Sequence, residues 1–174
     1  MKKWSLVNRL WHWLNAVVIF GSLVTIWLED VDVHVKVGYI LAALFVFRVI
    51  YNVLGFDSRN VKRSRETIKK GLQLFREKKF KLNAKEFYSV EKAGAKLSYS
   101  AFALILFGLI LTGLGMRFGI QFGLEAHRHT LKEVHEFFNL LMLLFIGAHI
   151  IGVVRAECTQ EPNIVSDMIN GGKE

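Results

Sequence analysis

The sequence predicts an all-α integral membrane protein, a four-helix bundle that forms a single domain. About half of its 174 residues are apolar (52%) and it has a single proline, and its mean hydropathy is +0.32. Backbone amides in lipid must bond within their own segment, and no alternation of polarity suggests a barrel, so apolar stretches of membrane-spanning length are expected to be helices. Four such stretches occur, at residues 10–28, 33–54, 97–115 and 134–154.

The connections between the expected spans predict how the chain lies in the membrane. The first, residues 29–32, is short and acidic, and the third, residues 116–132, holds three Lys or Arg residues. The second, residues 55–96, instead holds 13 of the 23 Lys and Arg residues against five acids, so its net charge of +8 equals that of the whole chain. Because positive loops stay on the cytoplasmic side, we expect this loop and both termini to be cytoplasmic.

The basic loop at residues 55–96 lies between two spans, which favours lipid phosphates over nucleic acid as its partner. Ile68, Leu72 and Phe75 fall on one face of a helix among basic residues, and this pattern is typical of a helix that lies on the inner leaflet. A merely solvated basic loop is the alternative. The single cysteine, Cys158, excludes an internal disulfide, and its place beyond the fourth span makes it a poor candidate metal ligand.

Four of the six histidines lie within or at the edge of the expected spans, where ionisable groups are costly and usually functional. His127 and His129 lie in the third connection instead. His135 and His149 are 14 residues apart on one expected helix, which places them on a similar face and roughly 21 Å apart along the axis. The fourth span therefore carries one histidine near each side of the membrane.

The predicted topology pairs these histidines. His12 begins the first span on the cytoplasmic side, and His149 lies towards the cytoplasmic end of the fourth; we call them pair A. His34 and His135 open the second and fourth spans on the opposite side; we call them pair B. The sequence thus predicts an inner pair A and an outer pair B, at two membrane depths.

We interpret each pair as the two axial ligands of one haem. Imidazole is a good iron ligand, and a haem with two histidine ligands has no open axial position, which suits electron transfer rather than oxygen binding. Hydrogen bonding of each histidine to a neighbouring helix is the alternative. Zinc would need four clustered ligands, and a proton relay would normally use carboxylates inside the spans, whereas Glu133 and Glu136 lie only at the rim. The expected fold therefore holds two haems stacked across the bilayer.

Other residues around the histidines fit a haem or an ordinary helix contact. Gly38 lies one turn after His34, and Gly147 and Gly152 flank His149; their lack of a side chain allows a macrocycle, or simply a neighbouring helix, to approach. Arg48 is 14 residues after His34, so it is expected near the inner haem, where it would pair with a propionate or else snorkel to the interface.

Several short motifs in this order resemble the bacterial cytochrome b561 and nickel-iron hydrogenase b-type cytochrome superfamily over nearly the whole chain. They include the histidine motifs His135-Glu136 and His149-Ile150 and the position of Arg48. The others are RLWHWLN at residues 9–15, HVKVGY at 34–39, LTG at 111–113 and NIVSDMING at 163–171.

The resemblance implies a dihaem b-type cytochrome of the bacterial inner membrane, an electron-transfer subunit of a respiratory oxidoreductase that links the quinone pool to a periplasmic partner. That partner is a hydrogenase-like subunit or a multihaem c-type cytochrome. The ligand pairs it implies are again pair A and pair B. In relatives of this kind quinone binds near the inner haem, which makes Asn15, Arg48 and Arg155 candidates for its site.

Two other functions remain open from the sequence. The protein is alternatively a membrane anchor and electron port for a periplasmic cytochrome, without quinone chemistry of its own and with residues 116–132 as the docking surface. It is also compatible with a stand-alone quinone-reactive cytochrome that passes electrons to a small oxidant.

Overall fold

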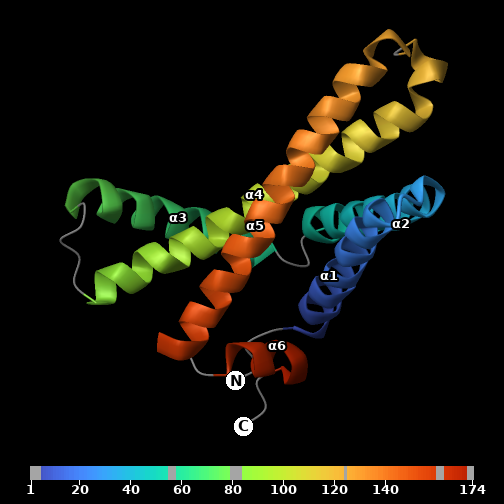
Figure 1. The fold of residues 1–174 in the computed structure, drawn as a ribbon. Coiled ribbons are helices and arrows are strands. Elements are labelled where there is room, and N and C mark those ends of the chain that lie inside the picture. Colours follow the sequence, from blue (N-terminus) through green and yellow to red (C-terminus); the bar gives the residue numbers. More distant parts are fainter. Residues whose placement is uncertain (1–4, 55–57, 79–83, 124, 160–162, 172–174) are drawn as a thin grey trace. The chain divides into compact units, whose positions relative to one another are not determined.

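The computed structural model describes residues 5–54, 58–78, 84–123, 125–159 and 163–171, and all regular elements in these ranges are helices (Figure 1). Four of these helices are long and apolar enough to span a membrane, which confirms the predicted all-α four-helix membrane fold. The spanning segments are Leu6–Trp27 (α1), Val31–Val53 (α2), Lys96–Phe118 within α4 and Arg128–Cys158 within α5.

The chain divides into two compact units. The first, Met1–Phe45 with Gly108–Glu174, holds α1, the first part of α2, the end of α4, the short 3₁₀ helices Gly119–Phe122 (η1) and Glu125–His127 (η2), α5 (Arg128–Thr159) and α6 (Ile164–Asn170). The second, Val46–Phe107, holds the end of α2, α3 (Ser58–Lys78) and most of α4 (Ala84–Phe118).

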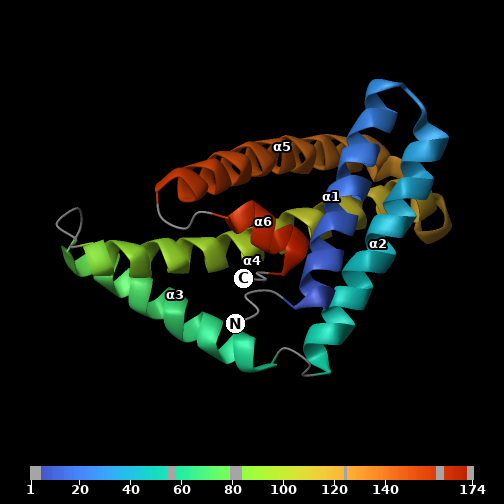
Figure 2. The ribbon, with the colours of Figure 1, turned by 90° about the horizontal axis from the view of Figure 1, so that it is seen from below.

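A tight turn joins α1 to α2 and brings the start of α2 beside the end of α1 (Figure 2). Glu29 adopts a left-handed conformation (φ 59°), and the amide of Asp30 donates to the carbonyl of Thr25. The Asp30 carboxylate then accepts the amide of Val33 at 3.0 Å, which caps the first turn of α2. His34 is thereby fixed in that first turn, next to the last turns of α1.

The end of α4 packs closely on α5 because small residues line the contact. A Cβ atom at Gly108 would collide with the ring of Phe138, and one at Gly115 would lie 3.3 Å from Leu131. Met142 of α5 is almost fully buried (1% exposed). Large apolar side chains elsewhere on the spans are exposed, among them Phe20 and Leu144, as expected of surfaces that face lipid.

The last helix of the first unit, α6, is tied to both α1 and α5. The Glu157 carboxylate on α5 accepts the amides of Asn163 and Val165 at the start of α6, at 2.7 and 3.2 Å. Arg9 on α1 donates to the carbonyl of Ile169 at 2.6 Å. Both ends of α6 are therefore held by hydrogen bonds, although a helix of this length is unstable by itself.

In the second unit, residues expected to form a basic loop fold into α3 and the first turns of α4. Gly71 of α3 packs against Ala93 of α4, and Lys96 donates to the hydroxyl of Thr67 at 3.3 Å. Leu72 and Phe75 remain about half exposed (54% and 48%) among basic residues. The amphipathic helix considered from the sequence is thus formed, and its contact with lipid stays a prediction.

Candidate functional site

The four span histidines form two ring pairs within the first unit. The ring centres of pair A, His12 on α1 and His149 on α5, are 6.1 Å apart, with their planes at 58°. Those of pair B, His34 on α2 and His135 on α5, are 6.3 Å apart, with their planes at 86°. The structure therefore brings together the same residues in each pair that the topology argument paired.

This spacing fits a metal ion between the two rings. Imidazole nitrogens bind metals at about 2.0–2.1 Å and lie about 1 Å from the ring centre, so two imidazoles on opposite sides of one ion have ring centres about 6 Å apart. Two ligands are too few to hold a bare ion, and within the described ranges no three His, Cys, Asp or Glu side chains gather as a metal site. A haem fits such a pair because its porphyrin supplies four further nitrogens.

In pair B the Nδ1 atoms are hydrogen-bonded. His34 Nδ1 lies 3.1 Å from the carbonyl oxygen of Ser22, with the hydroxyls of Ser22 and Thr25 at 3.2 and 3.3 Å. His135 Nδ1 lies 2.9 Å from the hydroxyl of Thr112. Histidines that bind a metal through one nitrogen commonly donate from the other to such acceptors, and here the remaining nitrogen is Nε2.

Pair A has aromatic neighbours instead. The ring of Trp13 meets that of His12 edge to face at 5.4 Å, and the ring of Phe145 is parallel to that of His149 at 6.3 Å. The Trp13 indole also donates to the carbonyl of Met168 on α6 at 3.4 Å. The start of α1 around pair A is thus held by the C-terminal helix.

Space beside the glycines is consistent with the approach of a flat ring. A Cβ atom at Gly38, Gly147 or Gly152 would meet no heavy atom within 4 Å. At Gly113, which lies beside His135 across the α4–α5 contact, an added Cβ atom would be 3.5 Å from the imidazole. Gly38 therefore remains a candidate haem contact, whereas Gly113 allows α4 to pack against the His135 ring.

Arg48 lies in the second unit and is buried (9% exposed). Its Nε donates to the Tyr99 hydroxyl at 3.0 Å, and its guanidinium lies over the ring of Tyr51 at 5.6 Å. Burial on these aromatic side chains differs from the simple snorkelling considered from the sequence. A contact with a propionate stays a prediction.

The other residues considered for a quinone site are Asn15 and Arg155. Asn15 is buried (3% exposed); its Nδ2 donates to the carbonyl of Trp11 at 2.8 Å, and its Oδ1 has no hydrogen-bond partner among the described residues. It lies one turn after His12 on α1. Arg155 is exposed, near the end of α5. Asn15 is thus the candidate with an acceptor still to be satisfied.

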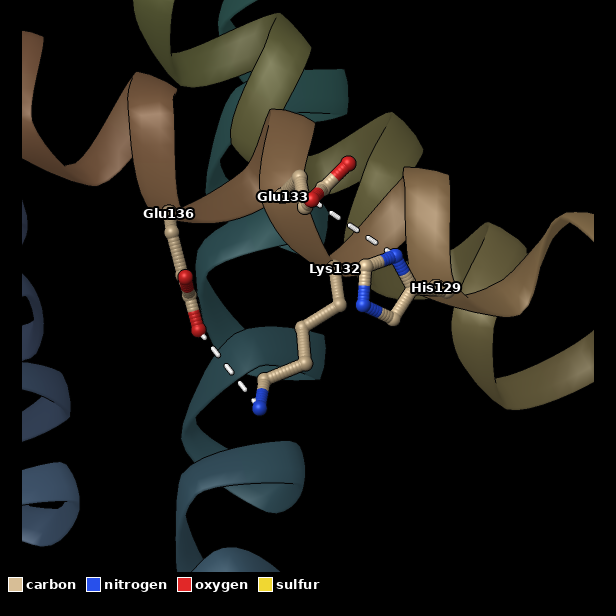
Figure 3. A network of polar contacts seen from close by, with 4 residues as sticks. All are labelled: His129, Lys132, Glu133 and Glu136. Carbon is tan, nitrogen blue, oxygen red and sulfur yellow. Dashed lines mark ion pairs between the residues drawn. The ribbon is translucent and has the colours of Figure 1, made fainter.

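The start of α5, next to His135, presents a charged surface (Figure 3). His129 lies 3.6 Å from the Glu133 carboxylate, and Lys132 lies 3.7 Å from that of Glu136; all four side chains are largely exposed. Exposed pairs at this spacing contribute only a few tenths of a kcal/mol, about 0.3–0.5. The charges of Lys132, Glu133 and Glu136 are therefore available to a partner at small cost in stability.

The polar residues that contact pair B were not among the sites expected from the sequence. Thr112 was considered only as part of the short LTG motif, and Ser22 and Thr25 were not considered. The available signal was a hydroxyl side chain inside an apolar span, which needs a hydrogen-bond partner. Such a residue commonly bonds to its own helix, so its second contact became visible only in three dimensions.

Comparison with known proteins agrees with the resemblance drawn from the motifs. A model of the prokaryotic cytochrome b561 family matches residues 3–171, nearly the entire chain. Neither the curated proteins nor the solved structures yield a match.

Proposed function

Because the chain belongs to the prokaryotic cytochrome b561 family, we propose that it is a dihaem cytochrome that carries electrons across the membrane between the quinone pool and a periplasmic redox partner. Membership itself makes the chain a bacterial multi-pass membrane protein, a b-type cytochrome of electron transfer that uses haem b. The number of haems, their ligands, the quinone and the orientation are the proposed part.

The observation that carries the proposal is the matching separation of the two ring pairs, 6.1 and 6.3 Å. Both pairs share α5, whose two histidines are roughly 21 Å apart along the helix axis. A haem held by each pair supplies one-electron exchange at its iron. His12 with His149, and His34 with His135, would each hold a haem through two imidazoles, which would favour electron transfer over oxygen binding.

Quinone is proposed to bind near pair A, with Asn15 as a hydrogen-bond acceptor. Its unsatisfied Oδ1 is buried in a spanning helix, where a polar atom without a partner costs about 1–3 kcal/mol. A quinol hydroxyl would satisfy it. Arg48 and Arg155 are further candidates for this site, and Arg48 is also a candidate propionate partner.

The periplasmic partner, a hydrogenase-like subunit or a c-type cytochrome, is proposed to dock next to pair B. The charge of the basic segment at residues 55–96 favours a cytoplasmic location for it and for both termini, and pair B then faces the periplasm. The exposed charges at the start of α5 would meet the partner there.

Histidine variants of the purified holoprotein test the ligand assignment. We expect His34→Ala and His135→Ala each to remove the same haem, and the double variant of pair B to retain the other. A variant that combines His34→Ala with His12→Ala should retain none. His129→Ala is the matched control, because the His129 side chain is exposed and lies beside Glu133 rather than beside either pair, and it should keep two haems in the reduced-minus-oxidised spectrum.

Two results would oppose the assignment. If the double variant of pair B loses both haems while the protein stays folded, or if His129→Ala loses one, the pairs are wrongly assigned. A separate assay addresses quinone: the isolated chain should oxidise a quinol analogue with reduction of its own haems, and a failure to do so favours the anchor role.

A further inference from the structure

The two histidine pairs differ in the hydrogen bonding of their ring nitrogens. In pair B, His34 Nδ1 lies 3.1 Å from the Ser22 carbonyl and His135 Nδ1 lies 2.9 Å from the Thr112 hydroxyl. In pair A, the described contacts of His12 and His149 are with each other and with the rings of Trp13 and Phe145. Within the described part of the chain, no hydrogen bond reaches either ring of pair A.

The partners in pair B favour a proton on each Nδ1 atom. The nearest partner of His34 Nδ1 is the Ser22 carbonyl at 3.1 Å, which only accepts. The Thr25 hydroxyl donates to that same carbonyl at 2.8 Å, so towards His34 it is an acceptor. Thr112 donates its own hydroxyl proton to the carbonyl of Gly108 at 2.7 Å, and its oxygen is then the acceptor for His135 Nδ1. Both imidazoles therefore donate from Nδ1 and have the Nε2 lone pair available for a metal.

Thr112 is placed for this role by the packing of α4 on α5. Its side chain is buried (6% exposed) in a spanning segment, and the absence of side chains at Gly108 and Gly113 brings α4 close to Phe138 and His135. A hydroxyl in this setting is costly unless it is hydrogen-bonded. Its hydrogen bonds, to the Gly108 and Leu109 carbonyls of its own helix and to the His135 ring, satisfy it.

We propose that Thr112 is a positioning residue that holds His135 and, together with the Ser22 carbonyl, lowers the reduction potential of the haem at pair B. A hydrogen bond from the distal nitrogen raises the basicity of a histidine ligand, and a more strongly donating ligand favours oxidised iron. Among the described residues no such bond reaches pair A, so the difference favours an electron at the site of pair A. This inference rests on the proposed assignment of one haem to each pair.

The test is a spectroelectrochemical titration of the holoprotein carrying Thr112→Val, which keeps the branched shape and removes the hydroxyl. The two titration waves are assigned beforehand with variants of His34 and His12 that each keep one haem. We expect the midpoint potential of the pair B haem to become more positive, that of the pair A haem to stay unchanged, and Thr112→Ser to restore the original value. Ser22→Ala tests the other partner: it removes the hydroxyl 3.2 Å from His34 Nδ1 but keeps the carbonyl at 3.1 Å, so it should shift the same potential less than Thr112→Val does.

The outcomes separate this inference from the function on which it rests. Two bound haems whose potentials are both unchanged in Thr112→Val would overturn the tuning role and leave the dihaem assignment intact. Equal shifts at both haems would also overturn it. Fewer than two haems in the unmodified chain would contradict the proposed function itself. Should Thr112→Val lose the haem at pair B, Thr112→Ala is titrated instead, with the same contrast expected.

Discussion

A substitution at Gly38 tests whether the space beside His34 holds a haem. It should affect haem binding and the stability of α2 in opposite directions. Gly38 lies one turn after His34 inside α2, and a Cβ atom there meets nothing within 4 Å. Replacing glycine by leucine in a helix interior removes an entropic penalty, so Gly38→Leu should stabilise α2 by about 0.5–1 kcal/mol. The same isobutyl group would occupy the space beside the ligand ring, and we expect it to displace the haem at pair B.

The two effects have opposite signs and are measured separately. Thermal unfolding of haem-free protein in mild detergent, followed by circular dichroism, should show Gly38→Leu slightly more stable than the unmodified chain. The haem content of protein made with haem supplied should fall from two per chain to one. Gly94→Leu is the matched control: Gly94 is also helical and open within 4 Å but lies in the other unit, so it should keep both haems.

One result would refute this reasoning. If Gly38→Leu keeps two haems with unchanged spectra, the open space beside His34 does not hold the macrocycle, and Gly38 is only a helix-packing residue. A loss of stability in haem-free protein would show that the space is closed in solution.

Three further predictions follow from the contacts. Glu157→Gln removes a charged acceptor at the start of α6 and should lower the stability of α6 by about 1 kcal/mol. Amide hydrogen exchange in α6 should become faster; unchanged exchange would show that these hydrogen bonds do not hold the helix. Lys132→Ala should change the free energy of unfolding by less than about 0.5 kcal/mol, because its pair with Glu136 is exposed; a larger loss would mean that the pair is structural. The ring planes are nearly perpendicular in pair B (86°) and further from perpendicular in pair A (58°). Perpendicular imidazoles leave the iron π orbitals nearly degenerate. The oxidised haem at pair B should therefore show the larger g anisotropy in electron paramagnetic resonance. His34→Ala should remove that signal, and its persistence would contradict the assignment.

The fold was predictable from the sequence because lipid limits the possible structures. Apolar stretches of sufficient length without strand periodicity can only be helices there, and all four appear as membrane-length helices. The proximity within each histidine pair followed from loop charge and the 14-residue spacing between His135 and His149. Helix geometry and topology together predict how deep in the membrane each histidine lies. At each of the two depths only two of the four span histidines are expected, so each has one possible partner.

Features that depend on side-chain packing were not predictable in this way. For residues 55–96 the sequence predicted a basic connection with an amphipathic helix around Ile68, Leu72 and Phe75, but hydropathy does not set the bounds of α3 or the polar first turns of α4. The bonds from His34 to Ser22 and from His135 to Thr112 depend on which helix faces which. The burial of Arg48 beside Tyr99 likewise depends on helix rotation, which sequence spacing does not fix.

The central claim is that each histidine pair holds one haem b. A pyridine haemochrome assay on the purified, detergent-solubilised chain, combined with amino-acid analysis for protein concentration, measures both haem type and haem number. We expect two haems b per chain. A ratio of one, or a haem of another type, would contradict it.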